Sequence, residues 1–166
     1  FTVIVAGIIG LISYSMPNLV GGGYEIIGQS LQLKLSFQIL ILILIARFIL
    51  TVFCYSTGVP GGIFAPLLAI GTLLGVAFGS LVVPLFDDSS LFTGMFAVAG
   101  MGGLFAACIR APITGIVLIV EMTQNYQLIL PLMITCITST TVVQFANEKP
   151  LYHQLLQRLL PKNHER

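Results

Sequence analysis

The sequence predicts an all-α integral membrane protein built from several tilted, broken and re-entrant helices. Charged residues make up 8% of the chain, against about 25% in a soluble domain. Hydrophobic residues make up 57%, and the mean hydropathy is +1.03. Glycine or proline separates nearly all the apolar segments, several of which are shorter than the roughly 20 residues that span a bilayer. Broken helices are tolerated in a membrane only where their backbone is buried in protein or lines a cavity, a pattern typical of transporters and channels.

The first third of the chain contains two apolar segments separated by a glycine joint. Residues 1–16 form the first segment, three consecutive glycines at 21–23 predict a flexible joint, and 24–33 is expected to be a short helix or re-entrant piece. The clearest membrane span is 36–55, whose only charge is Arg47. Because a charge is costly inside a bilayer, we expect Arg47 to be paired or to face a polar cavity rather than lipid.

A break at 58–62 precedes a helix that begins at Ile63 and reaches about Val83. The polar residues at 84–90 predict a surface loop, and a shorter apolar segment follows at 92–108. Glycines recur at every fourth position of the helix after the break: Gly71, Gly75 and Gly79. They share one face and form two overlapping GxxxG steps, which let another helix approach closely. We interpret this face as a packing surface rather than a functional site.

The last third contains apolar segments at 112–122 and 128–146, and a final helix at 151–160. Arg110 precedes a proline at a predicted break, where its guanidinium could satisfy carbonyl groups freed by the interruption. Glu121 ends an apolar segment and is followed by polar residues. We therefore expect it at a helix end near water, in a structural role.

We divide the chain into transmembrane helices at 1–150 and a final helix with a basic tail at 151–166. Four of the seven basic residues lie in the last eighteen positions: Lys149, Arg158, Lys162 and Arg166. By the positive-inside rule, this end is expected to be cytoplasmic. The sequence starts with Phe1 and is apolar at once, so we expect a piece of a longer chain rather than a signal peptide and mature protein.

Composition argues against several classes of function. Seven Lys and Arg residues face six Asp and Glu residues without a basic patch, so no nucleic-acid partner is expected. The three cysteines have no paired spacing and are read as small buried hydrophobes, without a disulfide or metal: Cys54, Cys108 and Cys136. An intramembrane hydrolase would need a nucleophile beside a base, but both histidines lie in the final fourteen residues. We expect neither an enzyme nor a cofactor.

The break before the second long helix has the pattern of an anion site. At the start of that helix, the backbone N–H groups of Gly62, Ile63 and Phe64 have no carbonyl one turn back, and the positive end of the helix dipole lies behind them. Tyr152 begins the last helix after a second proline break, and its hydroxyl can donate a hydrogen bond. The alternatives are an ordinary Gly-Pro turn and an interfacial tyrosine anchor.

Long, specific strings occur in order between residues 56 and 152: Ser-Thr-Gly-Val-Pro-Gly at 56–61, Gly-Ile-Phe-Ala-Pro at 62–66, Met-Gly-Gly-Leu-Phe-Ala-Ala-Cys-Ile-Arg-Ala-Pro-Ile-Thr-Gly at 101–115, Glu-Met-Thr-Gln-Asn-Tyr at 121–126 and Lys-Pro-Leu-Tyr at 149–152. These strings resemble the bacterial members of the CLC family of chloride channels and chloride/proton antiporters. The resemblance implies that the chain is the carboxyl-terminal part of such a protein, comprising most of the second of its two inverted-topology repeats.

The resemblance also implies a chloride site formed by the backbone N–H groups of Ile63 and Phe64 and the hydroxyl of Tyr152. Three further residues belong to the motif and would support its backbone: Gly61, Gly62 and Pro66. No lysine or arginine is in this set. Partial charges would hold chloride weakly enough to pass it on, whereas a full charge would slow its release.

The family's serine string and its gating and proton-transfer glutamates belong to the other half of the protein and have no counterpart in this chain. The function expected by analogy is a chloride/proton antiporter. A passive voltage-gated type of chloride channel and, for the isolated chain, a non-transporting fragment remain alternatives. The implied partners are chloride or another small anion, lipid, the missing amino-terminal half and a second copy in a homodimer, in a bacterial inner membrane.

Overall fold

The computed structural model describes residues 2–15, 37–56, 62–85, 89–147 and 150–159. The described residues form seven α-helices and two short 3-10 turns, without a strand: α1 (Thr2–Ser15), α3 (Phe37–Ser56), α4 (Phe64–Val82), η2 (Val83–Leu85), α5 (Ser89–Ile109), α6 (Pro112–Thr123), η3 (Tyr126–Leu128), α7 (Ile129–Phe145) and α8 (Leu151–Leu159). The predicted joint and re-entrant piece at 21–33 lie outside the described residues, as do Gly61 and most of the basic tail.

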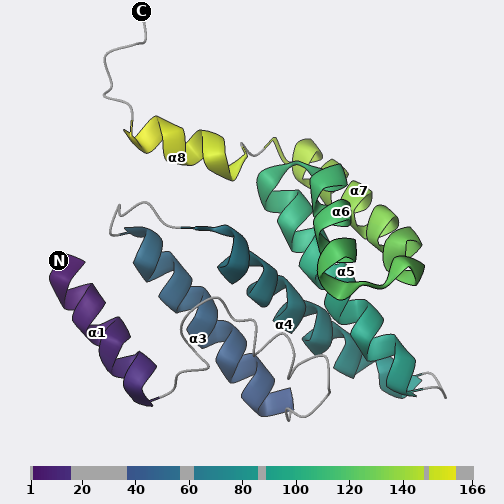
Figure 1. The fold of residues 1–166 in the computed structure, drawn as a ribbon, viewed down its shortest axis with the longest axis horizontal. Coiled ribbons are helices and arrows are strands. Elements are labelled where there is room, and N and C mark those ends of the chain that lie inside the picture. Colours follow the sequence, from purple (N-terminus) through teal and green to yellow (C-terminus); the bar gives the residue numbers. More distant parts are fainter. Residues whose placement is uncertain (1, 16–36, 57–61, 86–88, 148–149, 160–166) are drawn as a thin grey trace, which may run out of the picture.

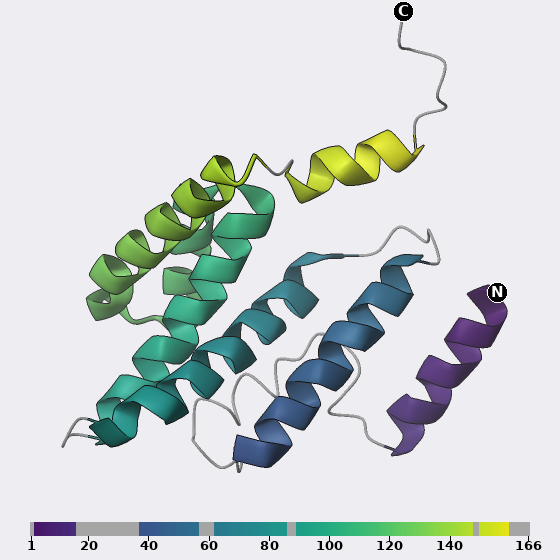
Figure 2. The ribbon, with the colours of Figure 1, turned by 180° about the vertical axis from the view of Figure 1, so that it is seen from behind.

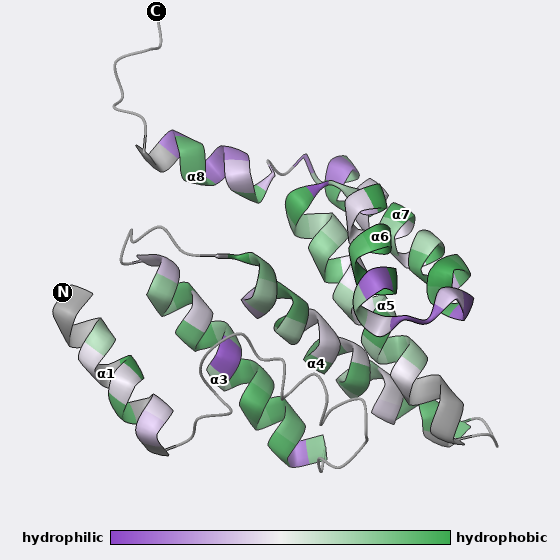
Figure 3. Cartoon of the chain, in the orientation of Figure 1, coloured by the Kyte–Doolittle hydropathy of each residue, from purple (hydrophilic) through white to green (hydrophobic). Residues whose placement is uncertain are grey.

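Three segments are long and apolar enough to cross a membrane: Phe37–Ser56, Phe64–Val82 and Tyr126–Phe145. The apolar part of α5 and the whole of α6 are shorter. Figure 3 shows hydrophobic residues along most of α3, α4 and α7, and a mixture of both kinds on α8. The prediction of an all-helical membrane protein with both full-length and short helices is confirmed.

The helices pack in sequence order from one edge of the molecule to the other. In Figure 1, α1 lies beside α3, and α3, α4 and α5 run side by side in alternating directions. Figure 2 shows the same order from behind, with α7 packed on α5. The helix α8 crosses the end of the molecule at which α3, α5 and α7 end and α4 and α6 begin. Two helix starts and three helix ends therefore lie at this end of the molecule.

Glycine contacts bring α4 and α5 together, as the GxxxG spacing predicts. A Cβ atom on Gly71 would lie 2.8 Å from the carbonyl oxygen of Gly100, and one on Gly75 would collide with the carbonyl of Phe96. The opposing atoms are backbone rather than flexible side chain. Since lipid is as apolar as the helices, such close contact is a main source of helix association in a membrane.

The largest buried cluster lies between α4, α5, α6 and α7 and is centred on Phe105 and Met101. Cys136 is fully buried in it and Cys108 is half-buried, whereas Cys54 is exposed on α3. The prediction that all three cysteines are buried is wrong for Cys54. An apolar segment has an outer as well as an inner face, and the sequence of α3 does not indicate on which face Cys54 lies.

The interruption between η2 and α5 is shorter than predicted. The sequence places a loop at 84–90 and a helix at 92–108, but α5 already begins at Ser89 and has 21 residues. Serine is favoured both in turns and at helix starts, so its presence does not distinguish the two.

Polar side chains bind α7 to α5 through backbone carbonyls. The hydroxyl of Ser139 donates to the carbonyl of Gly103 at 2.8 Å, and that of Thr140 reaches the carbonyl of Ala106 at 3.3 Å. Hydroxyl groups commonly hold membrane helices together in this way. They fix how far α5 and α7 can slide past one another.

Arg110 adds a third connection, at the break between α5 and α6. Its φ is 60°, a left-handed conformation that ends α5. Its Nη2 donates to the carbonyl of Val143 at 3.3 Å, in the last turn of α7. The amide of Asn147 bonds the carbonyl of Gln144, so it does not continue the helical pattern to Val143. The guanidinium thus binds one freed carbonyl, as predicted, but that carbonyl lies at the end of α7 and not at the break where Arg110 itself lies.

Candidate anion-binding site

The amino terminus of α4 presents free backbone donors. Ile63 is the N-cap residue, and its carbonyl accepts the first helical hydrogen bond, from the amide of Leu67 at 3.2 Å. The amides of Ile63, Phe64 and Ala65 come before this bond, so no carbonyl of the helix lies one turn behind them. Pro66 has no amide hydrogen. Three donors are thus concentrated at the positive end of the helix.

The side chains of α4 leave this end uncompensated. Ile63 makes no side-chain cap, and the first turn contains no acidic residue. A Cβ atom built on Gly62, just before the helix, would meet nothing within 4 Å among the described atoms. Such an end carries about half of a positive charge and attracts anions.

A cavity of about 470 Å³ adjoins this end of α4. Its wall includes Tyr55 and Ser56 from the end of α3, Ile63 from α4, and Leu151 and Gln154 from α8. The fold therefore brings Ser56 and Ile63, on either side of the first break, to the same space as Leu151, which follows the second break. Apolar side chains form most of the wall.

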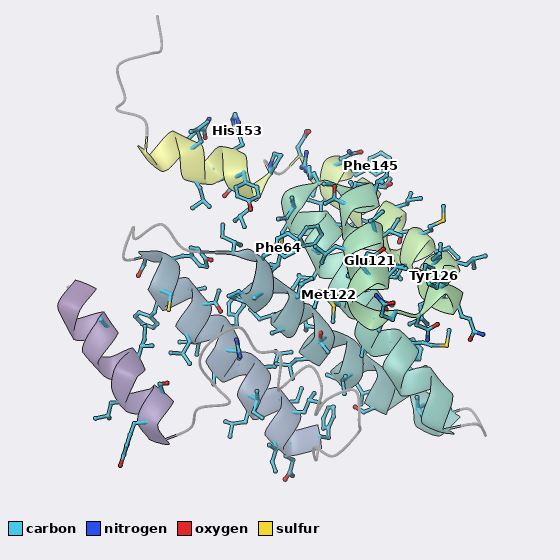
Figure 4. All side chains as sticks on the ribbon, in the orientation of Figure 1. Phe64, Glu121, Met122, Tyr126, Phe145 and His153 are labelled. Carbon is cyan, nitrogen blue, oxygen red and sulfur yellow. The ribbon has the colours of Figure 1, made fainter. Side chains whose placement is uncertain are left out.

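The three predicted chloride-binding residues take different positions relative to this cavity. Ile63 is buried and lines it. The side chain of Phe64 contacts Phe105 of α5 instead, with ring centroids 4.7 Å apart, and Figure 4 shows it at the start of α4. Tyr152 is 52% exposed and is not among the lining residues, although its neighbour Leu151 is. The part predicted for Ile63 and Phe64 requires only their backbone amides, whichever way their side chains point.

Tyr55 is a polar cavity residue that the sequence analysis does not single out. It lies next to the end of α3, lines the cavity and is near enough to Tyr152 for an electrostatic interaction. The phenol groups of Tyr55 and Tyr152 thus lie in the same region, and that of Tyr55 belongs to a residue of the cavity wall. The signal that could have found Tyr55 is its position directly before the break at 58–62.

The charged residues Arg47, Arg110 and Glu121 are not part of this cavity wall. Arg47 is buried, with 3% of its side chain exposed, so it does not face lipid in this chain. Glu121 is exposed in the last turn of α6, and its carbonyl accepts a hydrogen bond from the side chain of Gln124. The helix-end position predicted for Glu121 is confirmed. Within the described ranges, no three of His, Cys, Asp and Glu gather as metal ligands.

The arrangement can hold a small anion by partial charges alone. Backbone amides at a helix start donate hydrogen bonds without titrating, so the site keeps its charge at any ordinary pH. An apolar wall lowers the local dielectric constant and strengthens these interactions. Weak, reversible binding of a monovalent anion is the chemistry that this geometry favours.

Comparison with known proteins gives consistent matches. A family model described as voltage gated chloride channel matches residues 1–144. The H(+)/Cl(−) exchange transporter ClcA of Klebsiella pneumoniae (strain 342) is 53% identical over 159 residues, which cover 96% of this chain and 34% of that protein. The transporter of the same name from Salmonella agona (strain SL483) is 50% identical over 158 residues, which cover 95% of this chain and 33% of that protein.

A solved structure is also similar. It is the X-ray crystal structure of a slow cyanobacterial Cl⁻/H⁺ antiporter, with a TM-score of 0.76 and 41% sequence identity, and the match covers 84% of this chain and 33% of that one. The chain therefore spans about a third of the length of the curated relatives and of the solved structure that it matches. Most of each relative has no counterpart in these 166 residues.

Proposed function

Because the chain belongs to the voltage gated chloride channel family, we propose that it is the carboxyl-terminal part of a chloride/proton antiporter and that it binds chloride at the amino terminus of α4. Exchange transporters among its relatives, and the antiporter with the same fold, support the activity of the complete protein. The observation that carries the binding proposal is the start of α4, where Ile63 makes no side-chain cap and the first turn contains no acidic residue.

In this proposal, the amides of Ile63 and Phe64 bind the chloride directly. The hydroxyl of Tyr152 is a third ligand, supported by its position in the first turn of α8, where the neighbouring Leu151 lines the same cavity as Ile63. Three residues shape the backbone around the ligands: Gly61, Gly62 and Pro66. Pro66 suits the first turn of a helix because it has no amide hydrogen to leave unpaired.

The partners of the complete protein belong to the same proposal. Large exposed apolar side chains on α3 and α7, among them Leu42 and Leu130, would contact lipid, the rest of the protein or a second copy in a homodimer. Residues 1–150 would form the membrane part and 151–166 the final helix and basic tail, with that tail on the cytoplasmic side of a bacterial inner membrane.

Reconstitution of the complete protein in liposomes tests the activity. An outward chloride gradient should drive protons into the vesicles against their own gradient, and dissipating the chloride gradient should abolish this uptake. Chloride flux that cannot drive protons would identify a passive channel instead. If the liposomes show no chloride flux and no proton movement, both the antiporter and the channel are rejected.

The chain by itself is expected not to transport, because it spans about a third of the matched relatives. The matched experiment uses residues 1–166 alone, in the same liposomes and at the same molar ratio. Chloride flux from this chain alone would show that the remaining two thirds of the protein are not needed to complete the pathway.

A further inference from the structure

We propose that Phe105 and Gly115 are positioning residues for the anion site: the bare Cα of Gly115 on α6 leaves room for the Phe105 ring on α5, and that ring holds Phe64 and the start of α4 in place. The inference rests on the proposed binding of chloride at α4. It adds two residues to that function, neither of which would touch the anion.

The contact between Phe64 and Phe105 joins the site to the core. The two rings meet edge to face, with an interplanar angle of 68° and centroids 4.7 Å apart, a favourable arrangement for aromatic pairs. Phe105 is 1% exposed and belongs to the largest buried cluster, against which Phe64 packs. Phe64 is also the first residue of α4, and its amide is one of the proposed donors. The position of that amide is thus coupled to the position of the Phe105 ring.

Gly115 is the residue on the other helix that makes room for this ring. A Cβ atom at this position would lie 2.9 Å from Cδ1 of Phe105 and 3.5 Å from its Cε1. The backbone there is ordinary helix, and the amide of Gly115 donates to the carbonyl of Ala111 at 3.1 Å. Because glycine weakens a helix, the backbone gives no reason for it here. The space that the Phe105 ring occupies explains why a glycine stands at this position.

A displaced Phe105 ring has no free volume to enter. Protein interiors are packed like crystals, so a shift of a few tenths of an ångström is passed to the neighbours. Among those neighbours, Phe64 is the one whose backbone would bind the anion. Hydrogen bonds weaken steeply as their angle departs from linearity, so a small rotation of the start of α4 lowers halide affinity.

The chain supplies two matched glycine controls on α5. A Cβ atom on Gly102 would lie 2.6 Å from Cδ2 of Leu132 and 3.0 Å from Sγ of Cys136 on α7, and 3.3 Å from Cδ1 of Ile119 on α6, a similar crowding of the same core without contact to Phe105. A Cβ atom on Gly103 would have no neighbour nearer than 4.0 Å. Gly102→Ala therefore tests general core strain, and Gly103→Ala tests the added methyl group itself.

The experiment measures chloride affinity of the complete protein by calorimetry, the KM and maximal rate of chloride transport, and thermal stability in detergent. We expect Gly115→Ala to weaken binding roughly three- to tenfold and to raise KM with little change in maximal rate. Gly102→Ala should lower the melting temperature by about as much as Gly115→Ala does, but it should leave the chloride affinity unchanged. Gly103→Ala should alter neither quantity.

A double-mutant cycle identifies the ring as the link. In a Phe105→Leu background, Gly115→Ala should cost far less affinity, because the branched end of leucine can rotate away from the new methyl group. If Gly115→Ala does not fold, the chloride affinity of Phe105→Leu alone still tests whether the ring positions the anion site. Leucine keeps the position apolar, and the substitution should weaken binding about twofold to threefold because it removes the ring contact with Phe64.

The outcomes separate this inference from the proposed function. Calorimetry that detects no chloride binding to the unsubstituted protein rejects the anion site itself. Binding by the unsubstituted protein, with unchanged affinity in both Gly115→Ala and Phe105→Leu, rejects the positioning role and leaves the site intact. An equal loss of affinity in Gly102→Ala would also reject it, because general core strain would then explain the effect.

Discussion

At the scale of single residues, the candidate site depends on the backbone of Ile63 and Phe64 and on one hydroxyl, that of Tyr152. Ile63 lines the cavity, while the ring of Phe64 points into the core. The side chain of Phe64 should therefore affect binding only through its contact with Phe105, whereas the hydroxyl of Tyr152 should act on the anion directly. Substitutions at Phe64 and Tyr152 separate the two kinds of contribution.

The Tyr152→Phe substitution removes only the hydroxyl group. A hydrogen bond to a charged partner contributes about 1.5–3 kcal/mol, so chloride affinity should fall by roughly an order of magnitude or more in the complete protein. Calorimetry measures this directly, and proton coupling measured in liposomes should loosen in parallel. Tyr55→Phe is the matched control on α3. Unchanged affinity in Tyr152→Phe would remove Tyr152 from the ligand set.

The Phe64→Leu substitution keeps the amide and loses the ring. Affinity should fall by no more than about threefold, because any residue except proline retains the backbone donor. The same calorimetric titration gives the result. A complete loss of binding would contradict a site built from amides and would assign the main role to the aromatic side chain.

At the scale of elements, the glycine face of α4 sets how closely α5 can approach. Gly75→Ala would push a methyl group into the backbone around Phe96, which cannot rotate away. We expect a loss of about 1–3 kcal/mol, seen as a lower melting temperature in detergent.

The control for Gly75→Ala is Gly94→Ala, since a Cβ atom on Gly94 would meet nothing within 4 Å among the described atoms. It adds the same methyl group without a collision. Equal melting temperatures for the two variants would show that the close approach of α4 and α5 is not a source of stability.

The boundaries of the helices can be predicted from the sequence more readily than the contacts between them. The start of α4 and the break at Arg110 were predicted because glycine and proline interrupt apolar runs there, and the chemistry of free backbone groups is local. The start of α5 was misplaced because serine suits both loops and helix starts. The exposure of Cys54 and the part of Tyr55 in the cavity wall depend on how helices face one another. A single apolar sequence does not encode that directly.

At the scale of the whole molecule, the cavity beneath α8 joins parts of the chain that lie about 90 residues apart, from Ile63 to Leu151. The proposed ligand set of Ile63, Phe64 and Tyr152 contains no lysine or arginine. The central claim is therefore that helix-start amides, rather than a lysine or arginine, hold the anion.

Anomalous diffraction from crystals of the complete protein grown with bromide tests this claim most directly. The account predicts a bromide peak within hydrogen-bond distance of the backbone nitrogens of Ile63 and Phe64, with no cationic side chain in contact. A map without a peak there, or with that space filled by apolar side chains, would contradict it.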